Sequence, residues 1–179
     1  MPFKSYLPDP EGEFPAAAPE YFLYLLFQTA RRRDDQVDAA LAPLGLSANR
    51  ARTLTIIRRL EGCSMNALAR YTTIERTTLT REVDQLVARG LIERTVPAND
   101  RRRVSLSLTE EGEAIYARGI PLVVEATQDA LKGVDAETLR EFARILQIIM
   151  GNLVDDPDWA HELISYGRPD RPRLVQRQD

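Results

Sequence analysis

Arginines and threonines in the middle of the chain fall on one side of a helix of 3.6 residues per turn. They are Arg76, Thr77, Thr80 and Arg81. Arginine can donate two parallel hydrogen bonds to guanine, and the methyl group of threonine can contact the methyl group of thymine. Further polar candidates for the same surface are Ser64, Asn66, Thr73 and Thr78. The pattern indicates a helix that reads the major groove of DNA.

A run of arginines follows the turn-forming segment Pro97–Asp100. Proline, asparagine and aspartate favour turns. The flanking residues 91–96 and 104–108 are β-prone, and the second segment alternates apolar with polar side chains. We therefore predict a β-hairpin, from whose tip arginine could reach phosphates or an adjacent minor groove. The arginines at or beside this tip are Arg101, Arg102 and Arg103.

Two helices must hold the polar face in place. The first is predicted over residues 64–71, with Ser64 as its N-cap and a small or apolar face. The second is predicted over residues 74–89, and Gly90 supplies the left-handed residue that ends it. The apolar stripe of this second helix consists of Leu79, Val83, Leu86 and Val87. Together the two helices and the hairpin form a winged helix-turn-helix.

At these residues the chain resembles the MarR family of bacterial transcription regulators. Residues 74–86 are similar to that family's recognition helix, and residues 89–94 to its first wing strand. Residues 100–109 resemble the wing signature, in which an aspartate, an arginine and alternating apolar residues end in Leu-Thr. The resemblance implies that Asp100 and Arg102 form a salt bridge shaping the tip, and that Arg102 contacts a minor groove or a phosphate.

The resemblance covers about residues 19–154 and implies a homodimer on a pseudo-palindromic operator. The terminal helices are more apolar than one small lobe could cover, and a second copy is the simplest partner. We predict a mainly α fold with a small β-hairpin wing, in which terminal helices form a dimerisation region. The expected parts are an extended N-terminal arm (1–18), dimerisation helices (19–46 and 110–154), the winged helix-turn-helix DNA-binding domain (47–109) and a C-terminal tail (155–179).

Apolar periodicity and capping residues predict the remaining helices. Their expected ranges are 19–42, 48–60 after Ser47, 110–132 after Thr109, 136–153 after Asp135, and 157–166. Pro121 has no amide hydrogen and is expected to bend or interrupt its helix near Arg118, which could widen an adjacent cleft. The charged run 31–35 is expected to be a solvated, salt-bridged face, with a DNA-phosphate patch as the alternative.

The resemblance to the MarR family also implies a mode of regulation. Proteins of that family are usually repressors that release DNA on binding a small aromatic compound, often phenolic or acidic. The resemblance places the pocket between the dimer region and the DNA lobe, walled by the first, second and fifth helices. Tyrosine, glutamine and arginine could supply hydrogen bonds and a carboxylate partner there. The alternative is an amphipathic interface that binds no ligand. The candidate pocket residues are Tyr24, Phe27, Gln28, Arg31, Asn49 and Arg52.

The charge is unevenly distributed along the chain. The whole sequence has a formal net charge of −3, but residues 47–103 hold 12 arginines against 6 acidic residues. The rest holds 12 basic and 21 acidic residues, so local balances of +6 and −9 make up the total. A positive DNA-binding part would turn toward the phosphates.

Other chemistries find little support in the sequence. One histidine, His161, and one cysteine, Cys63, cannot form a disulfide or a cysteine-rich metal site, and we expect no metal or cofactor. No phosphate-binding loop, zinc-protease motif or nucleophile elbow occurs, so we do not expect an enzyme. With no run of 18 apolar residues and no signal-peptide pattern, we expect a cytoplasmic protein. The alternatives left open are a winged-helix protein-interaction module and a redox-sensing regulator using Cys63.

Overall fold

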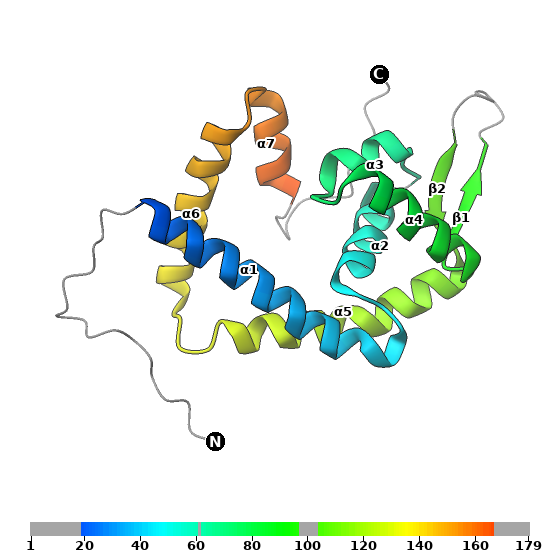
Figure 1. The fold of residues 1–179 in the computed structure, drawn as a ribbon, viewed down its shortest axis with the longest axis horizontal. Coiled ribbons are helices and arrows are strands. Elements are labelled where there is room, and N and C mark those ends of the chain that lie inside the picture. Colours follow the sequence, from blue (N-terminus) through cyan, green and yellow to red (C-terminus); the bar gives the residue numbers. More distant parts are fainter. Residues whose placement is uncertain (1–18, 61, 97–103, 167–179) are drawn as a thin grey trace.

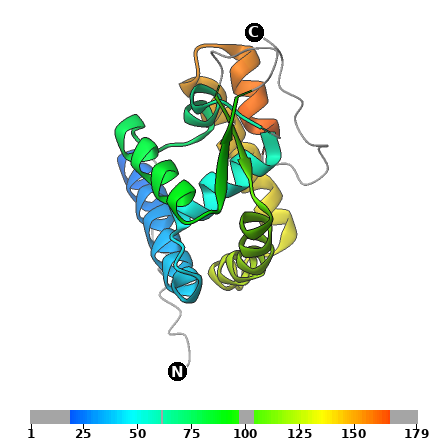
Figure 2. The same ribbon diagram turned by 90° about the vertical axis from the view of Figure 1, so that its right-hand side faces the viewer.

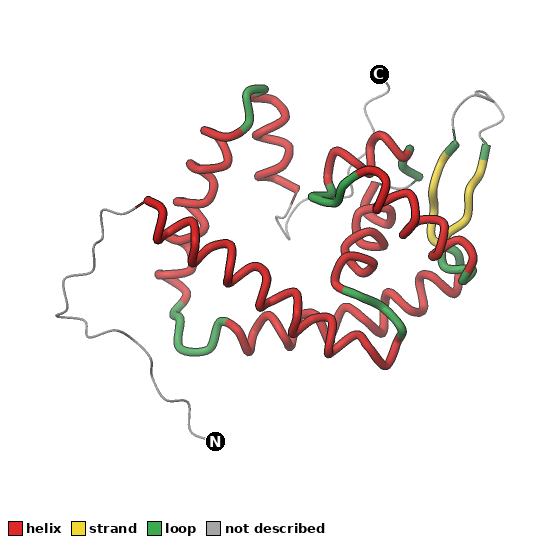
Figure 3. Tube along the Cα trace, in the orientation of Figure 1, coloured by secondary structure: helices red, strands yellow, loops and turns green. Residues whose placement is uncertain are grey.

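The computed structural model describes residues 19–60, 62–96 and 104–166 and is mainly helical (Figure 1). The elements are α1 (Pro19–Leu41), the 3₁₀ turn η1 (Ala42–Leu44), α2 (Ala48–Leu60), α3 (Met65–Tyr71), α4 (Arg76–Ala88), β1 (Ile92–Thr95), β2 (Ser105–Leu108), α5 (Glu110–Ala130), α6 (Ala136–Leu153) and α7 (Pro157–Tyr166). The predicted fold class, helices with one small hairpin, is confirmed (Figure 3). The expected N-terminal arm and the end of the expected tail lie outside the described residues.

The hairpin stands beside α4 at one end of the molecule (Figures 1 and 2). Its strands β1 and β2 are antiparallel, with Ile92 opposite Leu108 and Thr95 opposite Ser105. Cys63 extends the pairing, because its carbonyl oxygen accepts a 2.8 Å hydrogen bond from the amide of Leu106. The segment before α3 therefore ties the wing to the helix-turn-helix.

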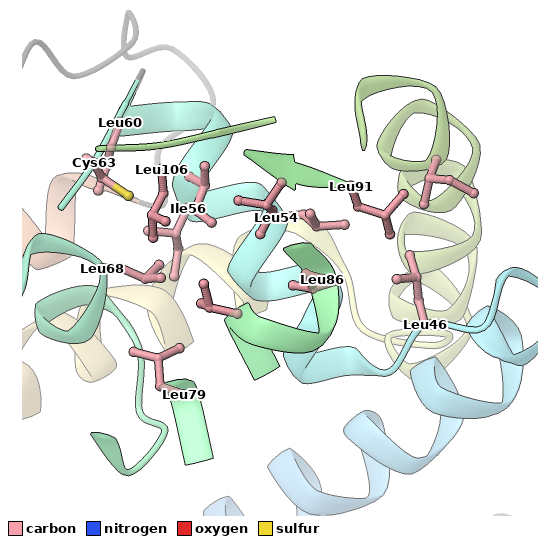
Figure 4. Packing of buried hydrophobic residues seen from close by; sticks show 14 of the residues in the cluster. Leu46, Leu54, Ile56, Leu60, Cys63, Leu68, Leu79, Leu86, Leu91 and Leu106 are labelled. Carbon is pink, nitrogen blue, oxygen red and sulfur yellow. The ribbon is translucent and has the colours of Figure 1, made fainter. Parts of the chain in front are cut away.

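The hydrophobic core lies between α2, α3, α4 and the hairpin (Figure 4). The predicted stripe of α4 is buried at Leu79, Val83 and Leu86. The apolar spacing of α2 also predicts Ala51, Leu54, Ile57 and Leu60 to face inward, and Leu54, Ile57 and Leu60 are buried. Ile56, on the same helix, is also buried although it was not predicted to face inward. A helix in the middle of a small lobe is covered on more than one side, so a single stripe underestimates its buried face.

Helices α1 and α5 run side by side and join the lobe to the rest of the chain (Figure 1). Val37 and Leu41 of α1 are buried, and Gly119 of α5 lets Leu41 approach to within 3.4 Å of where a Cβ would stand. Pro121 was expected to bend or interrupt the helix near Arg118, and the interruption was wrong, because α5 continues as one helix past Pro121. Packing against α1 maintains the helix although proline cannot donate the hydrogen bond at that position.

The capping predictions are confirmed at several helix starts. Ser64 accepts a hydrogen bond from the amide of Ala67 in α3, and Thr109 accepts one from the amide of Gly112 in α5. Asp135 accepts hydrogen bonds from two amides of α6. These contacts span two or three residues, so the local sequence is enough to predict them.

Other boundaries and faces differ from the predictions. Helix α4 begins at Arg76 rather than residue 74, because Glu75 is its N-cap. Both strands are shorter than expected, since pairing begins only at Ile92 and Ser105. The apolar spacing of α1 predicts Leu23 on its apolar side, but this residue is 55% exposed in the single chain. No helix of the described residues is long and apolar enough to cross a membrane.

Candidate nucleic-acid interface

Helix α4 has one face buried in the core and an opposite face exposed to solvent. Leu79, Val83 and Leu86 have no exposed surface, which fixes the rotation of the helix about its axis. The opposite side leaves Arg76 and Arg81 exposed, as the periodicity predicted. Exposed arginines on a rigidly packed helix are suited to base-edge contacts, because their backbone positions do not have to be ordered on binding.

Arg76 is held by the neighbouring helix. Its Nη2 donates a 3.1 Å hydrogen bond to Oδ1 of Asn66 on α3. Both side chains are exposed, so the contact lies on the surface where α3 and α4 meet. The structure therefore brings two predicted DNA-binding residues together, and Asn66 orients Arg76.

The start of α4 carries a carboxylate that was not among the predicted site residues. Oε2 of Glu75 accepts hydrogen bonds from the amides of Thr77 (2.9 Å) and Thr78 (3.2 Å), and from the hydroxyl of Thr77. The hydroxyl of Thr77, followed by these amides, lowers the pKa of Glu75. Glutamate is not among the strongly preferred N-cap residues, although a negative charge at a helix N-terminus is favourable and was the available signal.

Several predicted contact residues already use their hydroxyl groups within the protein. Ser64 caps α3, and the Thr80 hydroxyl donates a 2.9 Å hydrogen bond to the carbonyl oxygen of Arg76. Their hydroxyl groups are therefore less available to DNA than the sequence suggested. Thr73 and Thr78 are exposed next to the same surface.

Ion pairs and hydrogen bonds hold the recognition helix and the wing in register. Arg94 on β1 donates a 2.5 Å hydrogen bond to Asp84 on α4. Arg89, which follows α4, donates hydrogen bonds to the carbonyl oxygens of Leu44 (3.1 Å) and Gly45 (2.5 Å). These arginines support the lobe. The predicted wing-tip residues Asp100, Arg101, Arg102 and Arg103 lie outside the described residues.

A polar cluster joins α1, α2 and α5 near the predicted ligand site. Arg52 donates hydrogen bonds to both carboxylate oxygens of Asp34 (3.0 and 3.1 Å) and to Asn49 (2.7 Å). Arg33 donates to Oδ1 of Asp34 at 3.1 Å, an oxygen that it shares with Arg52, and to the Thr127 hydroxyl at 3.3 Å. Part of the run 31–35 thus faces the protein, whereas it was predicted to be solvated.

The remaining ligand candidates lie on α1. Tyr24 and Phe27 are 57% and 69% exposed, so they do not line an enclosed site within the single chain. Arg31 pairs with Asp35 on the same helix at 3.3 Å, as the solvated-face prediction expected. Gln28 is half-buried. The structure thus joins Asn49 to Arg52, while Tyr24, Phe27 and Arg31 occupy exposed positions along α1.

Glu82 links this cluster to the recognition helix. It lies on α4, and its Oε2 is buried without a hydrogen-bond partner among the described residues. Burial raises the pKa of Glu82, and the nearby charges of Arg50 and Arg52 oppose that rise. Arg50 also donates a hydrogen bond to Gln85 on α4. Charges at the α1–α2 junction therefore act directly on α4.

Cys63 has the surroundings of a structural residue, and His161 is exposed. Cys63 is fully buried, and burial raises the pKa of its thiol to about 12. Its thiol is therefore protonated at neutral pH, unlike the exposed thiolate of a peroxide sensor. No group of three or more metal-ligating side chains occurs within residues 19–60, 62–96 and 104–166.

Known proteins share this arrangement. A family model described as MarR family matches residues 44–103. MarR from Escherichia coli in its apo form is 27% identical, with a TM-score of 0.62, covering 70% of this chain and 94% of that one. A cysteine-to-serine mutant of the same protein complexed with operator DNA is 26% identical, with a TM-score of 0.67, covering 72% and 93%. A Mycobacterium tuberculosis MarR family protein in complex with p-aminosalicylic acid is 27% identical, with a TM-score of 0.61, covering 74% and 98%.

The anchored α4, its exposed arginines and the adjoining hairpin define a winged helix-turn-helix transcription regulator. The matching family model covers this lobe, and the solved structures extend the similarity to the flanking helices. Residues 44–103 are thus similar to the MarR family, and the fold of the described residues is that of MarR-type regulators.

Proposed function

We propose that this regulator is a homodimeric repressor that binds a pseudo-palindromic operator and releases it when a small aromatic acid binds. The observation that carries the proposal is the exposed polar face of α4, a helix whose rotation is fixed by its buried stripe. On this face Arg76 is held by Asn66, and Arg81 is exposed. A neighbour of similar fold was crystallised with operator DNA, which supports the same mode of binding.

The apolar faces of the terminal helices support the dimer. Large side chains remain exposed along α1 and α6 in the single chain: Leu23, Tyr24, Phe27, Phe142, Ile145 and Leu153. A surface of this size favours a permanent interface. Two-fold symmetry would then present two copies of α4 to successive major-groove turns, about 10 base pairs or more apart.

The polar cluster around Asp34 supports the proposed binding of an aromatic acid. Arg52 and Arg33 could each pair with a carboxylate in place of Asp34, since arginine forms forked hydrogen bonds with planar anions. The aromatic rings of Tyr24 and Phe27 lie one to three turns before Asp34 on the same helix. A related protein binds p-aminosalicylic acid, which combines an aromatic ring with a carboxylate. Because Glu82 of α4 lies within the field of Arg52, a bound anion would alter the recognition helix.

The test is selection of bound duplexes from a random pool at near-physiological salt, followed by titration of the enriched duplex with aromatic acids. We expect a palindromic duplex that one of the acids releases. The variant Arg52→Gln should retain operator binding and lose the response to the acid. Failure to enrich any sequence would overturn the proposed operator binding and favour a protein-interaction module. An enriched operator that no acid releases would contradict only the proposed release by an aromatic acid.

A further inference from the structure

Helix α7 returns from α6 to the DNA-binding lobe and docks on the end of α3 (Figure 1). The ring of Tyr71 stands at its centre. Trp159 meets that ring edge-on, with centroids 5.0 Å apart, and Tyr166 lies against it at 4.8 Å. The hydroxyl of Tyr71 also donates a hydrogen bond to Glu162. Trp159, Glu162 and Tyr166, spaced along α7, therefore all contact Tyr71 of the helix-turn-helix.

Two arginines of the lobe complete the contact. The guanidinium of Arg70 lies 4.1 Å from the ring centroid of Trp159, and that of Arg59 lies 4.6 Å from the centroid of Tyr166. Each pair has the geometry of a cation–π interaction. On α7 itself, Ala160 and Ser165 are each only 5% exposed. The side chains of α7 and the lobe thus form a packed junction with both charge and aromatic specificity.

This junction gives the lobe a second, non-covalent connection to the α6–α7 segment. The lobe is connected to α6 covalently through α5, and α7 packs on α6 before it returns to α3. A short segment between Leu153 and Pro157 joins α6 to α7, so the two helices cannot separate far. The lobe is therefore attached to α6 at two points, and a second attachment suppresses rotation about the first.

We propose that α7 is a strap that fixes the angle between the helix-turn-helix and α6, and so sets the half-site spacing that the dimer accepts. The proposal rests on the proposed function, because α6 carries an apolar face that a second copy would cover. One extra base pair moves a half-site by about 3.4 Å and rotates it by roughly 35° around the DNA axis. A lobe attached at two points cannot follow that shift, whereas a lobe attached through α5 alone can turn toward it.

The first experiment compares operators whose half-sites keep their sequence but are separated by the selected spacing or by one additional base pair. The double variant Trp159→Ala/Tyr166→Ala removes both rings that contact Tyr71. His161→Ala, on the exposed side of the same helix, is the matched control. Since couplings within proteins correspond to factors of about 5–150, we expect the wild-type preference for the selected spacing to fall roughly tenfold in the double variant. Binding to an isolated half-site should not change.

A purely structural role for α7 predicts another result. Loss of stability would weaken binding to both operators and to the isolated half-site by the same factor, leaving the spacing preference unchanged. That outcome would overturn the proposal once hydrogen exchange has shown that α7 is released in the double variant. An unchanged preference in His161→Ala with a reduced preference in the double variant would support it.

The wild-type protein provides a second measurement that does not depend on a variant folding. Trp159 is the single tryptophan of the chain, so its fluorescence reports the docking of α7. On the operator with the additional base pair, α7 must leave Tyr71, and the emission should shift to longer wavelength relative to the selected operator. Equal emission on both operators would overturn the strap. Failure to obtain any operator would overturn the proposed function instead, so the two failures are distinguishable.

Discussion

Arg76 and Arg81 leave the same exposed side of α4, but their surroundings differ. Arg76 is tied to Asn66, whereas Arg81 lies one turn further along the helix. A tethered guanidinium keeps one geometry, so it can read a base with little loss of side-chain entropy. At the residue scale, the proposed interface would combine one side chain that is already held in place with others that become ordered on binding.

We expect Arg81→Ala to relax the preference for one base pair of each half-site. A bidentate arginine contact contributes about 1–3 kcal/mol of discrimination between bases, and alanine removes both donors. The measurement is affinity for duplexes substituted at each position in turn. Arg140→Ala, an exposed arginine on α6, serves as the control and should leave every preference unchanged. Uniform weakening on all duplexes would instead assign Arg81 to a phosphate.

The thiol of Cys63 should be inert in the folded protein. With a pKa of about 12, it is a thiolate at pH 8 in on the order of one molecule in ten thousand. We expect iodoacetamide to leave native Cys63 unmodified and to alkylate it in urea, as measured by mass spectrometry. Peroxide at moderate concentration should not change DNA binding. Rapid alkylation of the native protein would revive the redox alternative.

Helix α5 begins in close contact with the wing. A Cβ on Gly112 would lie 2.0 Å from the backbone oxygen of Leu91, which also accepts a hydrogen bond from the amide of Thr109. Glycine at this position lets α5 start directly against the residue before β1. At the element scale, the geometry between α5 and the wing depends on this one close approach.

We expect Gly112→Ala to reduce the free energy of unfolding by about 2–3 kcal/mol, because backbone must move to relieve the overlap. Gly151→Ala is the matched substitution within α6, where nothing lies within 4 Å of the added Cβ. That change should raise the free energy of unfolding by about 0.5–1 kcal/mol through helix propensity. Urea unfolding at one protein concentration measures both. Equal effects would show that the Gly112 contact does not constrain the fold.

The docking of α7 should weaken at alkaline pH. Burial, followed by the hydrogen bond and negative charge of Glu162, raises the pKa of Tyr71, while Arg70 opposes the rise. Burial raises the pKa of Tyr166 to about 12. Released phenols titrate near 10, so between pH 10 and 12 the docked state holds more protons and loses stability as pH rises.

Trp159 emission should therefore shift to longer wavelength between pH 10 and 12, and Tyr71→Phe should show a smaller change over that range because one titrating group is absent. Circular dichroism at the same pH values separates release of α7 from unfolding, to which the buried Cys63 also contributes with the same sign. A pH-independent emission would contradict the shared burial of these phenols.

At the scale of the whole molecule, the exposed apolar side chains of α1 and α6 lie away from the basic lobe. Residues 47–103 hold 12 arginines against 6 acidic residues, whereas the rest of the chain holds 12 basic and 21 acidic residues. In the proposed complex, this division would turn α4 toward the phosphates and leave the opposite end for contact with a second copy. A DNA-binding dimer is therefore consistent with an overall negative charge.

Phe142→Asp should weaken the dimer by about 3 kcal/mol, roughly 100-fold in Kd, because a carboxylate would be buried without a partner. Sedimentation across a dilution series measures the dimer, and circular dichroism verifies the fold. Gln147→Asp adds the same charge on an exposed part of α6 outside the apolar stripe, and should leave the dimer intact. If both variants remained dimeric, the interface would have to lie elsewhere.

The sequence by itself determined the helices, most of their ends and the two faces of α4. These features depend on apolar spacing within a few turns and on caps such as Ser64, Thr109 and Asp135, which contact amides two or three residues away. These signals involve residues close together in the sequence, so they can be recognised from the sequence alone. The family resemblance added the role of the recognition helix for the same reason, since its motif is contiguous.

Only the tertiary structure decided how distant residues combine. Tyr71 meets Glu162 across 91 positions of sequence, and Arg33 meets Thr127 across 94. The packing of α1 on α5 also overrode the helix-breaking tendency of Pro121. Periodicity shows which face of each helix is apolar. Which other helix packs on that face depends on the path of the chain in space and on the free energy of the whole core. The strap and the polar cluster therefore became visible only when the helices were placed in space.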